Sequence, residues 1–209
     1  MQHKKQDIRE ISNDELKTFL TEHGEKPFRA KQIDEWLWQK HARKFEDMTN
    51  LSLKTRQLLS ESFELKYLAP RYEQLSDDDT LKVAFQTHDQ KMVEGVLIPS
   101  GKRVTACLSS QIGCNLNCTF CATGKMGLIR NLKHWEIYDQ LAELQMLSQQ
   151  QFGNNISNVV FMGMGEPLQN YQEVKAAILR MTSDKGMGMA PRRITVSTAG
   201  LVKQIYKLA

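Results

Sequence analysis

The sequence has few cysteines, no long apolar run and little excess charge. Its 209 residues include only 4 cysteines, and the first ten residues contain no apolar segment of the kind that directs export. The longest uninterrupted run of apolar residues and glycine, Val159 to Gly165, is far too short to cross a bilayer. These absences argue against a membrane protein and predict a soluble, unexported, cytoplasmic protein that does not depend on structural disulfides.

The bulk composition is that of an ordinary globular protein. Hydrophobic residues make up 41%, charged residues 25% and aromatic residues 8% of the chain, which excludes a disordered, collagenous or coiled-coil protein. The 28 basic and 24 acidic residues give a formal net charge of +4. A charge this small permits a polyanionic partner without requiring one.

The hydrophobic pattern changes twice along the chain and predicts three domains. Residues 1–75 are predicted to form a small helical accessory domain, whose first helix begins at a capping box from Ser12 to Glu15 and stops at Gly24. Residues 76–102 alternate apolar and polar side chains on both sides of a short turn, and this pattern predicts a β-hairpin wing. Residues 103–209 alternate apolar strands (104–108, 159–162 and 194–196) with amphipathic helices. Such alternation is typical of parallel βα units, so the expected fold class is α/β.

All four cysteines lie between positions 107 and 121, and three of them form a C-x3-C-x2-C run: Cys114, Cys118 and Cys121. A structural zinc site usually takes four ligands from two separated pairs. Three thiolates on one loop instead suit three irons of a 4Fe-4S cluster, which leaves the fourth iron open to a small chelating molecule. The alternatives are a zinc site and a trio of inert buried thiols. Cys107, taken alone, is typical of a small buried hydrophobic residue.

The cysteine spacing, with Phe120 just before the last cysteine, resembles the signature of the radical S-adenosylmethionine (SAM) superfamily. In those enzymes SAM chelates the open iron, and an electron from the cluster cleaves SAM to a 5′-deoxyadenosyl radical. Three longer segments, Cys107–Leu132, Phe161–Asn170 and Arg192–Gly200, are similar to adenine methyltransferases of the RlmN/Cfr family. The resemblance implies the N-terminal portion of a radical SAM partial (β/α)6 barrel, preceded by the helical domain and the hairpin. It also implies a 4Fe-4S cluster and SAM as cofactors.

A second motif, which includes Gly165 and Glu166, follows a strongly apolar strand. Glycine lets the backbone approach a ligand, and a glutamate accepts hydrogen bonds from an ammonium group. Alone, the motif also fits an ordinary strand-ending turn, and Ser197 at the end of the next strand fits a turn hydroxyl. The family resemblance implies that all three residues bind SAM.

The stretch from Gly95 to Trp135 contains basic residues and no acidic one. Positive charge beside a reactive centre attracts phosphate, so this patch predicts an RNA substrate, with a solvated surface as the alternative. Its basic residues are Lys102, Arg103, Lys125, Arg130 and Lys133.

The resemblance supplies the reaction, which is methylation of carbon 2 of adenine in 23S ribosomal RNA and in certain transfer RNAs. The methyl group passes through a methylated cysteine near the C-terminus, and electrons come from a donor such as a flavodoxin system. The resemblance implies that Glu94 is the base that removes the ring proton. It further implies that Cys107 releases the RNA by forming a disulfide with the methyl-carrying cysteine. From its sequence context alone, Glu94 is a solvent-facing strand residue.

The family's methyl-carrying cysteine has no counterpart in this sequence, because the four cysteines already have other roles. About three βα strands fit after the hairpin, which is fewer than a (β/α)6 barrel needs. We therefore expect the chain to be the N-terminal part of a longer enzyme or a truncated copy. Two alternative functions remain, which are Cfr-type methylation of adenine carbon 8 and a noncatalytic iron-sulfur or zinc RNA-binding module.

Overall fold

A computed structural model describes residues 5–208 of the chain. The described chain divides into two compact units, the first comprising residues 5–67 with 183–188 and the second comprising residues 68–182 with 189–208. The division into three domains with boundaries at 75 and 102 stays a prediction. No helix in the described part of the chain combines the length and apolar character needed to cross a membrane.

The first unit is helical. Its predicted capping box is confirmed: the Ser12 hydroxyl accepts the Glu15 N–H at 3.2 Å, and the Glu15 carboxylate accepts the Ser12 N–H at 2.7 Å. These bonds satisfy two donors at the helix start that have no partner within the helix. The helices of this unit are η1 (Ile8–Glu10), α1 (Asn13–Glu22), α2 (Arg29–Trp38), η2 (Phe45–Asp47) and α3 (Leu53–Ser62).

The second unit is built on a six-stranded mixed sheet with the order β1-β2-β3-β4-β7-β8. Strands β1 to β4 are antiparallel, whereas β4, β7 and β8 are mutually parallel. The predicted hairpin is confirmed as β2 and β3, and it continues the same sheet as the parallel strands. The strands are β1 (Ala69–Leu75), β2 (Leu81–Gln86), β3 (Met92–Ser100), β4 (Arg103–Cys107), β7 (Ile156–Phe161) and β8 (Ile194–Val196).

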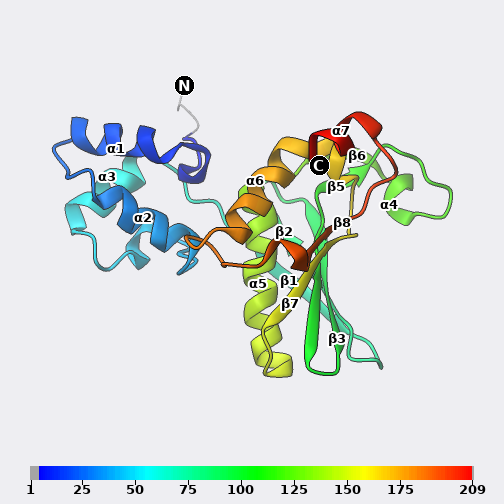
Figure 1. Cartoon of the computed structure of the whole chain (residues 1–209). Coiled ribbons are helices and arrows are strands. Elements are labelled where there is room, and N and C mark those ends of the chain that lie inside the picture. The colour runs from blue at the N-terminus through cyan, green and yellow to red at the C-terminus, as the bar shows by residue number, and fades with distance from the viewer. Residues whose placement is uncertain (1–4, 209) are drawn as a thin grey trace. The chain divides into compact units, whose positions relative to one another are not determined.

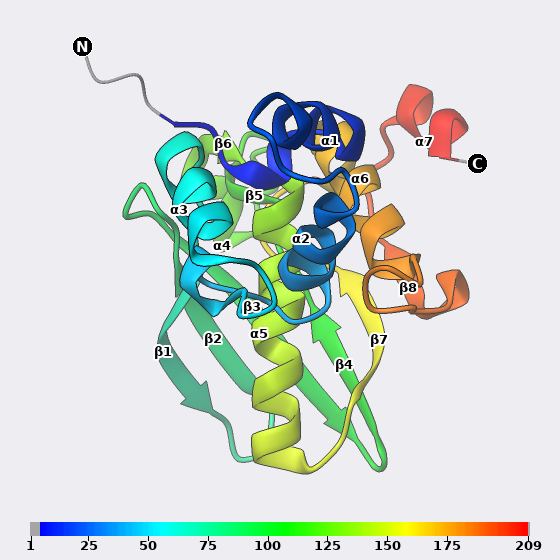
Figure 2. The ribbon, with the colours of Figure 1, turned by 90° about the vertical axis from the view of Figure 1, so that its left-hand side faces the viewer.

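Helix α5 (His134–Phe152) covers one face of this sheet and packs on β3, β4 and β7, as Figure 2 shows. Gly95 of β3 lies under it, and a Cβ at this position would come within 3.1 Å of Leu144 and 3.0 Å of Phe85. A larger residue here would require the Leu144 and Phe85 side chains to shift by a few tenths of an ångström, so glycine favours the close packing of helix on strand. Helix α6 (Tyr171–Thr182) packs beside α5.

The strand register places a row of side chains on the sheet face opposite α5. Val96 of β3 is paired with Cys107 of β4, Cys107 with Val160 of β7, and Val160 with Thr195 of β8. Glu94 lies two residues before Val96, so it shares this face. The sheet therefore presents Glu94 and Cys107 on the same side.

A small second sheet carries the three clustered cysteines. It consists of β5 (Gln111–Cys114) and β6 (Gly127–Asn131), with the one-turn helix α4 (Ala122–Lys125) between them. In Figure 1 the α4 segment extends away from β5 and β6. We call residues 111–131 the cysteine hairpin. The remaining elements of the second unit are η3 (Pro167–Asn170), η4 (Pro191–Arg193) and α7 (Val202–Leu208).

Candidate cofactor and active site

The loops that carry the predicted site residues meet at one edge of the main sheet. Strands β4, β7 and β8 are parallel, so the segments that follow their carboxyl ends emerge on the same side. Strand β3 runs in the opposite direction, and Glu94 near its beginning therefore lies at this edge too. This is the edge at which open parallel sheets bind their ligands.

Glu94 and Cys107 are diagonal neighbours on adjacent strands, a relation that places Cα atoms about 7–8 Å apart. The Glu94 side chain is 47% exposed, and its carboxylate lies 3.5 Å from Lys82 Nζ. Cys107 is only 8% exposed. Burial raises the pKa of the Cys107 thiol, although a hydrogen bond from the Met162 backbone acts in the opposite direction.

The cysteine hairpin holds three thiols in different settings. Cys114 is buried at the end of β5, whereas Cys118 and Cys121 are half-buried in the loop, where the Cys121 N–H donates to the Cys118 carbonyl at 3.0 Å. Within residues 5–208, no three His, Cys, Asp or Glu side chains are close enough together to hold a metal ion. The donor set nevertheless fits a 4Fe-4S cluster, because three free thiols lie on one short loop.

The structure contains no disulfide in its described part, and all four cysteines are free thiols. The disulfide implied by the family resemblance is therefore not supported. The methyl-carrying cysteine that would pair with Cys107 has no counterpart in this sequence. Cys107 is buried on the main sheet, apart from the hairpin that carries Cys114, Cys118 and Cys121.

The loop of residues 163–166, which we call the glycine loop, follows β7. The Glu166 carboxylate accepts the Leu168 N–H at 2.9 Å and the Ala199 N–H at 2.7 Å, and the residue is only 4% exposed. Ser197 is exposed and lies two residues before Ala199, after the end of β8. Glu166 thus holds together the two loops that carry the predicted SAM contacts. Its burial and its two backbone partners differ from an ordinary strand-ending turn, in which a glutamate is exposed to solvent.

The glycines of this loop are required by the protein itself. A Cβ on Gly163 would lie 2.6 Å from Ser109 Oγ and 2.8 Å from the Leu108 carbonyl oxygen. A Cβ on Gly165, whose φ is +94°, would lie 2.5 Å from Gln111 Cβ. The space that a side chain on either glycine would need is filled by residues 108–111. The contact of the Gly165 backbone with SAM stays a prediction.

The predicted basic patch does not form one surface around the cysteine hairpin. Arg130 of β6 makes two hydrogen bonds to Asp89 in the β2–β3 turn, at 2.8 and 2.9 Å, and two to Glu136 of α5, at 2.7 and 2.8 Å. Lys133 Nζ lies 3.4 Å from the Glu173 carboxylate. These acidic partners lie outside the sequence window that contained only basic residues.

The N-terminal end of the predicted patch lies far from the cysteine end of β4. Lys102 and Arg103 lie at the start of β4, roughly 13 Å along the strand from Cys107 at its end. Lys125 on α4 is exposed beside the cysteines. The prediction of a continuous patch is therefore wrong, because folding separates or pairs residues that are neighbours in sequence.

Arg130 and its partners form a charged cluster that is partly shielded from water. The Glu136 side chain is fully buried, and those of Arg130 and Asp89 are 25% and 34% exposed. The hydrogen bond from Arg130 lowers the pKa of Asp89 well below its usual range, against the effect of burial. Burial alone would lower the pKa of Arg130, but its bonds to Glu136 and Asp89 raise it. The cluster joins the cysteine hairpin to the main sheet and to α5.

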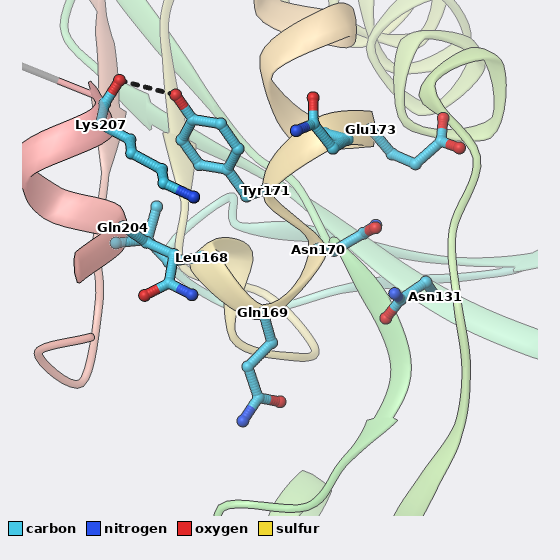
Figure 3. A pocket seen from close by; sticks show the side chains of 9 residues that line it. Asn131, Leu168, Gln169, Asn170, Tyr171, Glu173, Gln204 and Lys207 are labelled. Carbon is cyan, nitrogen blue, oxygen red and sulfur yellow. Dashed lines mark hydrogen bonds between the residues drawn. The ribbon is translucent and has the colours of Figure 1, made fainter. Parts of the chain in front are cut away.

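A pocket of about 340 Å³ lies beside η3 and α7 (Figure 3). Its wall is closed by the Tyr171 hydroxyl, which donates to the Lys207 carbonyl at 2.7 Å. No cysteine lines it. The pocket is therefore separate from the cysteine ligand set.

Glu173 at this pocket also receives hydrogen bonds from the backbone and the ring of His134, at 2.8 and 2.9 Å. Burial raises the pKa of Glu173, but the bonds from His134 and the charges of His134 and Lys133 outweigh it and lower the pKa to about 2. The carboxylate thus ties the start of α5 to the start of α6.

Sequence reasoning missed the polar residues that connect these parts, namely Ser109, Gln111 and Gln140. All three are at most 1% exposed. The available signal was the run Ser109-Ser110-Gln111, which interrupts apolar residues between Cys107 and Cys114. Buried polar groups need hydrogen-bond partners, so such a run indicates a tertiary polar network.

Comparison with known proteins agrees with this geometry. The family model of the ribosomal RNA large subunit methyltransferase N-terminal domain matches residues 6–65, and that of the radical SAM superfamily matches residues 108–208. The crystal structure of a radical SAM methyltransferase from Sphaerobacter thermophilus superimposes with a TM-score of 0.86 at 37% identity, covering 97% of this chain and 60% of that one. The fold and the cysteine loop define a radical SAM protein.

Curated relatives narrow the assignment. The probable dual-specificity RNA methyltransferase RlmN of Flavobacterium psychrophilum is 50% identical over 209 residues, which are 100% of this chain and 60% of the relative. The protein of the same name from Bacillus subtilis is 43% identical, over 94% of this chain and 54% of the relative. The chain belongs to the RlmN/Cfr family of radical SAM methyltransferases, whose cofactors are a 4Fe-4S cluster and SAM. It spans about 60% of the length of the first of these relatives.

Proposed function

We propose that this protein, at the length of its relatives, methylates carbon 2 of adenine in 23S ribosomal RNA and in certain transfer RNAs. The observation that carries the proposal is the placement of Glu94 and Cys107 on one sheet face, at the edge that also bears the cysteine hairpin and the glycine loop. The relatives' name, dual-specificity RNA methyltransferase, supports RNA as the substrate. The proposal also implies a cytoplasmic location and an electron donor such as a flavodoxin system.

In this proposal Cys114, Cys118 and Cys121 hold the 4Fe-4S cluster, and Gly165, Glu166 and Ser197 contact SAM. When bound, these cofactors supply radical chemistry, which carbon 2 requires because it is too electron-poor to attack a SAM methyl group directly. The Glu166 carboxylate uses two of its roughly four acceptor positions on backbone N–H groups, so it keeps capacity for the SAM ammonium group.

Glu94 serves as the base that takes the proton from carbon 2 once the RNA is covalently linked to the protein. The Glu94 side chain is about half exposed and lies on the same sheet face as Cys107. An adenine flipped out of the RNA onto this face can therefore contact the Glu94 carboxylate. A carboxylate within hydrogen-bond reach of the proton is the geometric requirement for this role.

Cys107 serves as the thiol that releases the RNA, by attacking the sulfur that links protein to RNA. A sulfur–sulfur bond forms between Cys107 and the methyl-carrying cysteine, which lies outside this chain. The carbon–sulfur bond breaks, its electron pair stays on the transferred carbon attached to the adenine ring, and that carbon takes up a proton to become the methyl group. Burial raises the pKa of Cys107, so the thiol stays protonated at rest and becomes nucleophilic only after losing its proton.

The experiment that tests the function uses the protein extended to its relatives' length, reconstituted anaerobically with iron and sulfide. Incubation with SAM, reductant and 23S ribosomal RNA is expected to yield 5′-deoxyadenosine and 2-methyladenosine, identified by mass spectrometry. Formation of 8-methyladenosine would instead establish Cfr-type activity. Absence of SAM cleavage would leave a noncatalytic iron-sulfur RNA-binding protein.

Glu94→Gln in the extended protein should accumulate RNA-linked protein while still producing 5′-deoxyadenosine. The amide cannot accept the ring proton, so the reaction stops after the covalent link forms. Denaturing gel electrophoresis with labelled RNA measures the adduct. Glu73→Gln on β1, another exposed strand glutamate, is the matched control and should turn over normally. Normal turnover by Glu94→Gln would remove Glu94 from the mechanism.

Cys107→Ala and Cys107→Ser should both bind the cluster and SAM and then stall with RNA attached, because neither side chain has a nucleophilic sulfur. If Cys107 is only a packing residue, Cys107→Ala lowers the free energy of unfolding by on the order of 1 kcal/mol. Activity then falls only as far as the folded fraction falls. Val104→Ala, a buried truncation on the same strand, provides that comparison. Release of methylated RNA by Cys107→Ala at the wild-type rate would rule out the proposed role.

A further inference from the structure

The segment Ser109–Gln111 joins β4, which ends at Cys107, to β5, which ends at Cys114. Its three side chains are polar, yet each is at most 1% exposed. Burial this deep is costly for polar groups unless they are hydrogen-bonded. The side chains of Ser109 and Gln111 are hydrogen-bonded, whereas the Ser110 hydroxyl has no partner among the described residues. The bonds that this segment makes therefore indicate its role.

Gln111 connects the cysteine hairpin to the glycine loop through its side-chain amide. Its Oε1 accepts the Glu166 N–H at 2.8 Å, and its Nε2 donates to Asn131 Oδ1 at the end of β6, also at 2.8 Å. Its Cβ occupies the space that a side chain on Gly165 would need. One residue thus contacts both Gly165 and Glu166, and it lies three positions before Cys114.

Ser109 adds a second connection between the glycine loop and the main sheet. Its hydroxyl donates to the Glu94 carbonyl at 2.5 Å and accepts the Met164 N–H at 2.7 Å. The Gln140 side chain of α5 holds the Ser109 backbone at both its N–H (3.0 Å) and its carbonyl (3.1 Å). The segment is therefore anchored on the sheet side, and Gln111 transmits that anchoring to Glu166.

We propose that Gln111 is a positioning residue for SAM, which it does not touch: it fixes the glycine loop against the cysteine hairpin. The inference rests on the proposed role of Gly165 and Glu166 as SAM contacts. A loop that is already ordered loses less conformational entropy when ligand binds, so freeing it weakens binding. Loss of one such hydrogen bond corresponds to about a tenfold weaker affinity for SAM.

The test replaces Gln111 with Met, which keeps the side-chain length but cannot hydrogen-bond to Glu166 or Asn131. Amide hydrogen exchange of residues 163–166 is measured by NMR on the apo chain, and the dissociation constant for SAM and the iron content are measured on the reconstituted, extended protein. We expect about tenfold faster exchange of the Glu166 amide, about tenfold weaker SAM binding and unchanged iron content. Ser148→Ala, which removes a partly buried hydrogen bond from a buried serine to the Asn154 carbonyl at the far end of α5, is the matched control.

Asn131→Ala is a second variant, at an exposed position where folding is not at risk, and it should give a smaller increase in exchange at the same amides. Unchanged exchange at residues 163–166 in both variants would overturn the inference. If Gln111→Met instead raised amide exchange rates over the whole chain, in the way that a general loss of stability in Ser148→Ala would, the inference would also be overturned. If the wild-type extended protein does not bind SAM, the proposed function fails, and the exchange data still decide whether Gln111 orders the loop.

Discussion

Replacing any one of Cys114, Cys118 and Cys121 with Ala is expected to abolish the broad visible absorption of the anaerobically reconstituted protein. In the proposed site each thiolate supplies one of three bonds from the protein to the cluster, and within residues 5–208 no further His, Cys, Asp or Glu completes a metal site with them. Iron and sulfide content, measured chemically on each variant, should fall together with the absorption.

Cys107→Ala is the matched control, because it removes the remaining cysteine without touching the hairpin. It should retain full iron content and the wild-type spectrum. If all three hairpin variants keep full iron and sulfide, the cluster assignment is wrong. Stoichiometric zinc in place of iron in the purified wild-type protein, with no cluster formed on reconstitution, would favour the zinc alternative.

Arg130→Met is expected to lower the free energy of unfolding by about 3–5 kcal/mol, because it leaves the buried Glu136 carboxylate without its main charged partner. Methionine preserves much of the side-chain length, so the loss reflects the ion pairs and hydrogen bonds more than packing. Urea denaturation followed by circular dichroism measures the change.

Lys133→Met is the comparison for an exposed ion pair. Lys133 and Glu173 are 3.4 Å apart with side chains 46% and 27% exposed, so this variant should lose less than about 1 kcal/mol. A similarly small loss for Arg130→Met would mean that the Arg130 cluster contributes little to stability.

The Arg130 cluster and Gln111 have a common consequence for function. Arg130 attaches β6 to α5 and to the β2–β3 turn, and Gln111 attaches β5 to the glycine loop. The ends of the cysteine hairpin are thus held, while the loop that carries Cys118 and Cys121 stays half-exposed. If the proposed cluster assignment holds, the neighbouring loops stay in place when Cys118 and Cys121 bind iron.

Local sequence patterns determined several features by themselves. The capping box at Ser12, the β2–β3 hairpin and the spacing of the three clustered cysteines each depend on residues a few positions apart. Interactions of this kind act within one helix turn, one hairpin or one loop, so a short window contains all the residues that matter. The family resemblance, which rests on such segments, predicted the fold class and the cofactors.

Tertiary structure alone decided which residues from distant parts of the chain pair with one another. Arg130 is separated from Asp89 by 41 positions and Gln111 from Glu166 by 55, so neither partnership is visible in a local pattern. The basic run therefore predicted a surface that folding divides. The contact of Gln111 with Gly165 also has no sign in the local sequence. Strand register likewise placed Glu94 and Cys107 on one face. The physical reason is that pairing across the sheet brings together groups whose sequence positions carry no sign of one another.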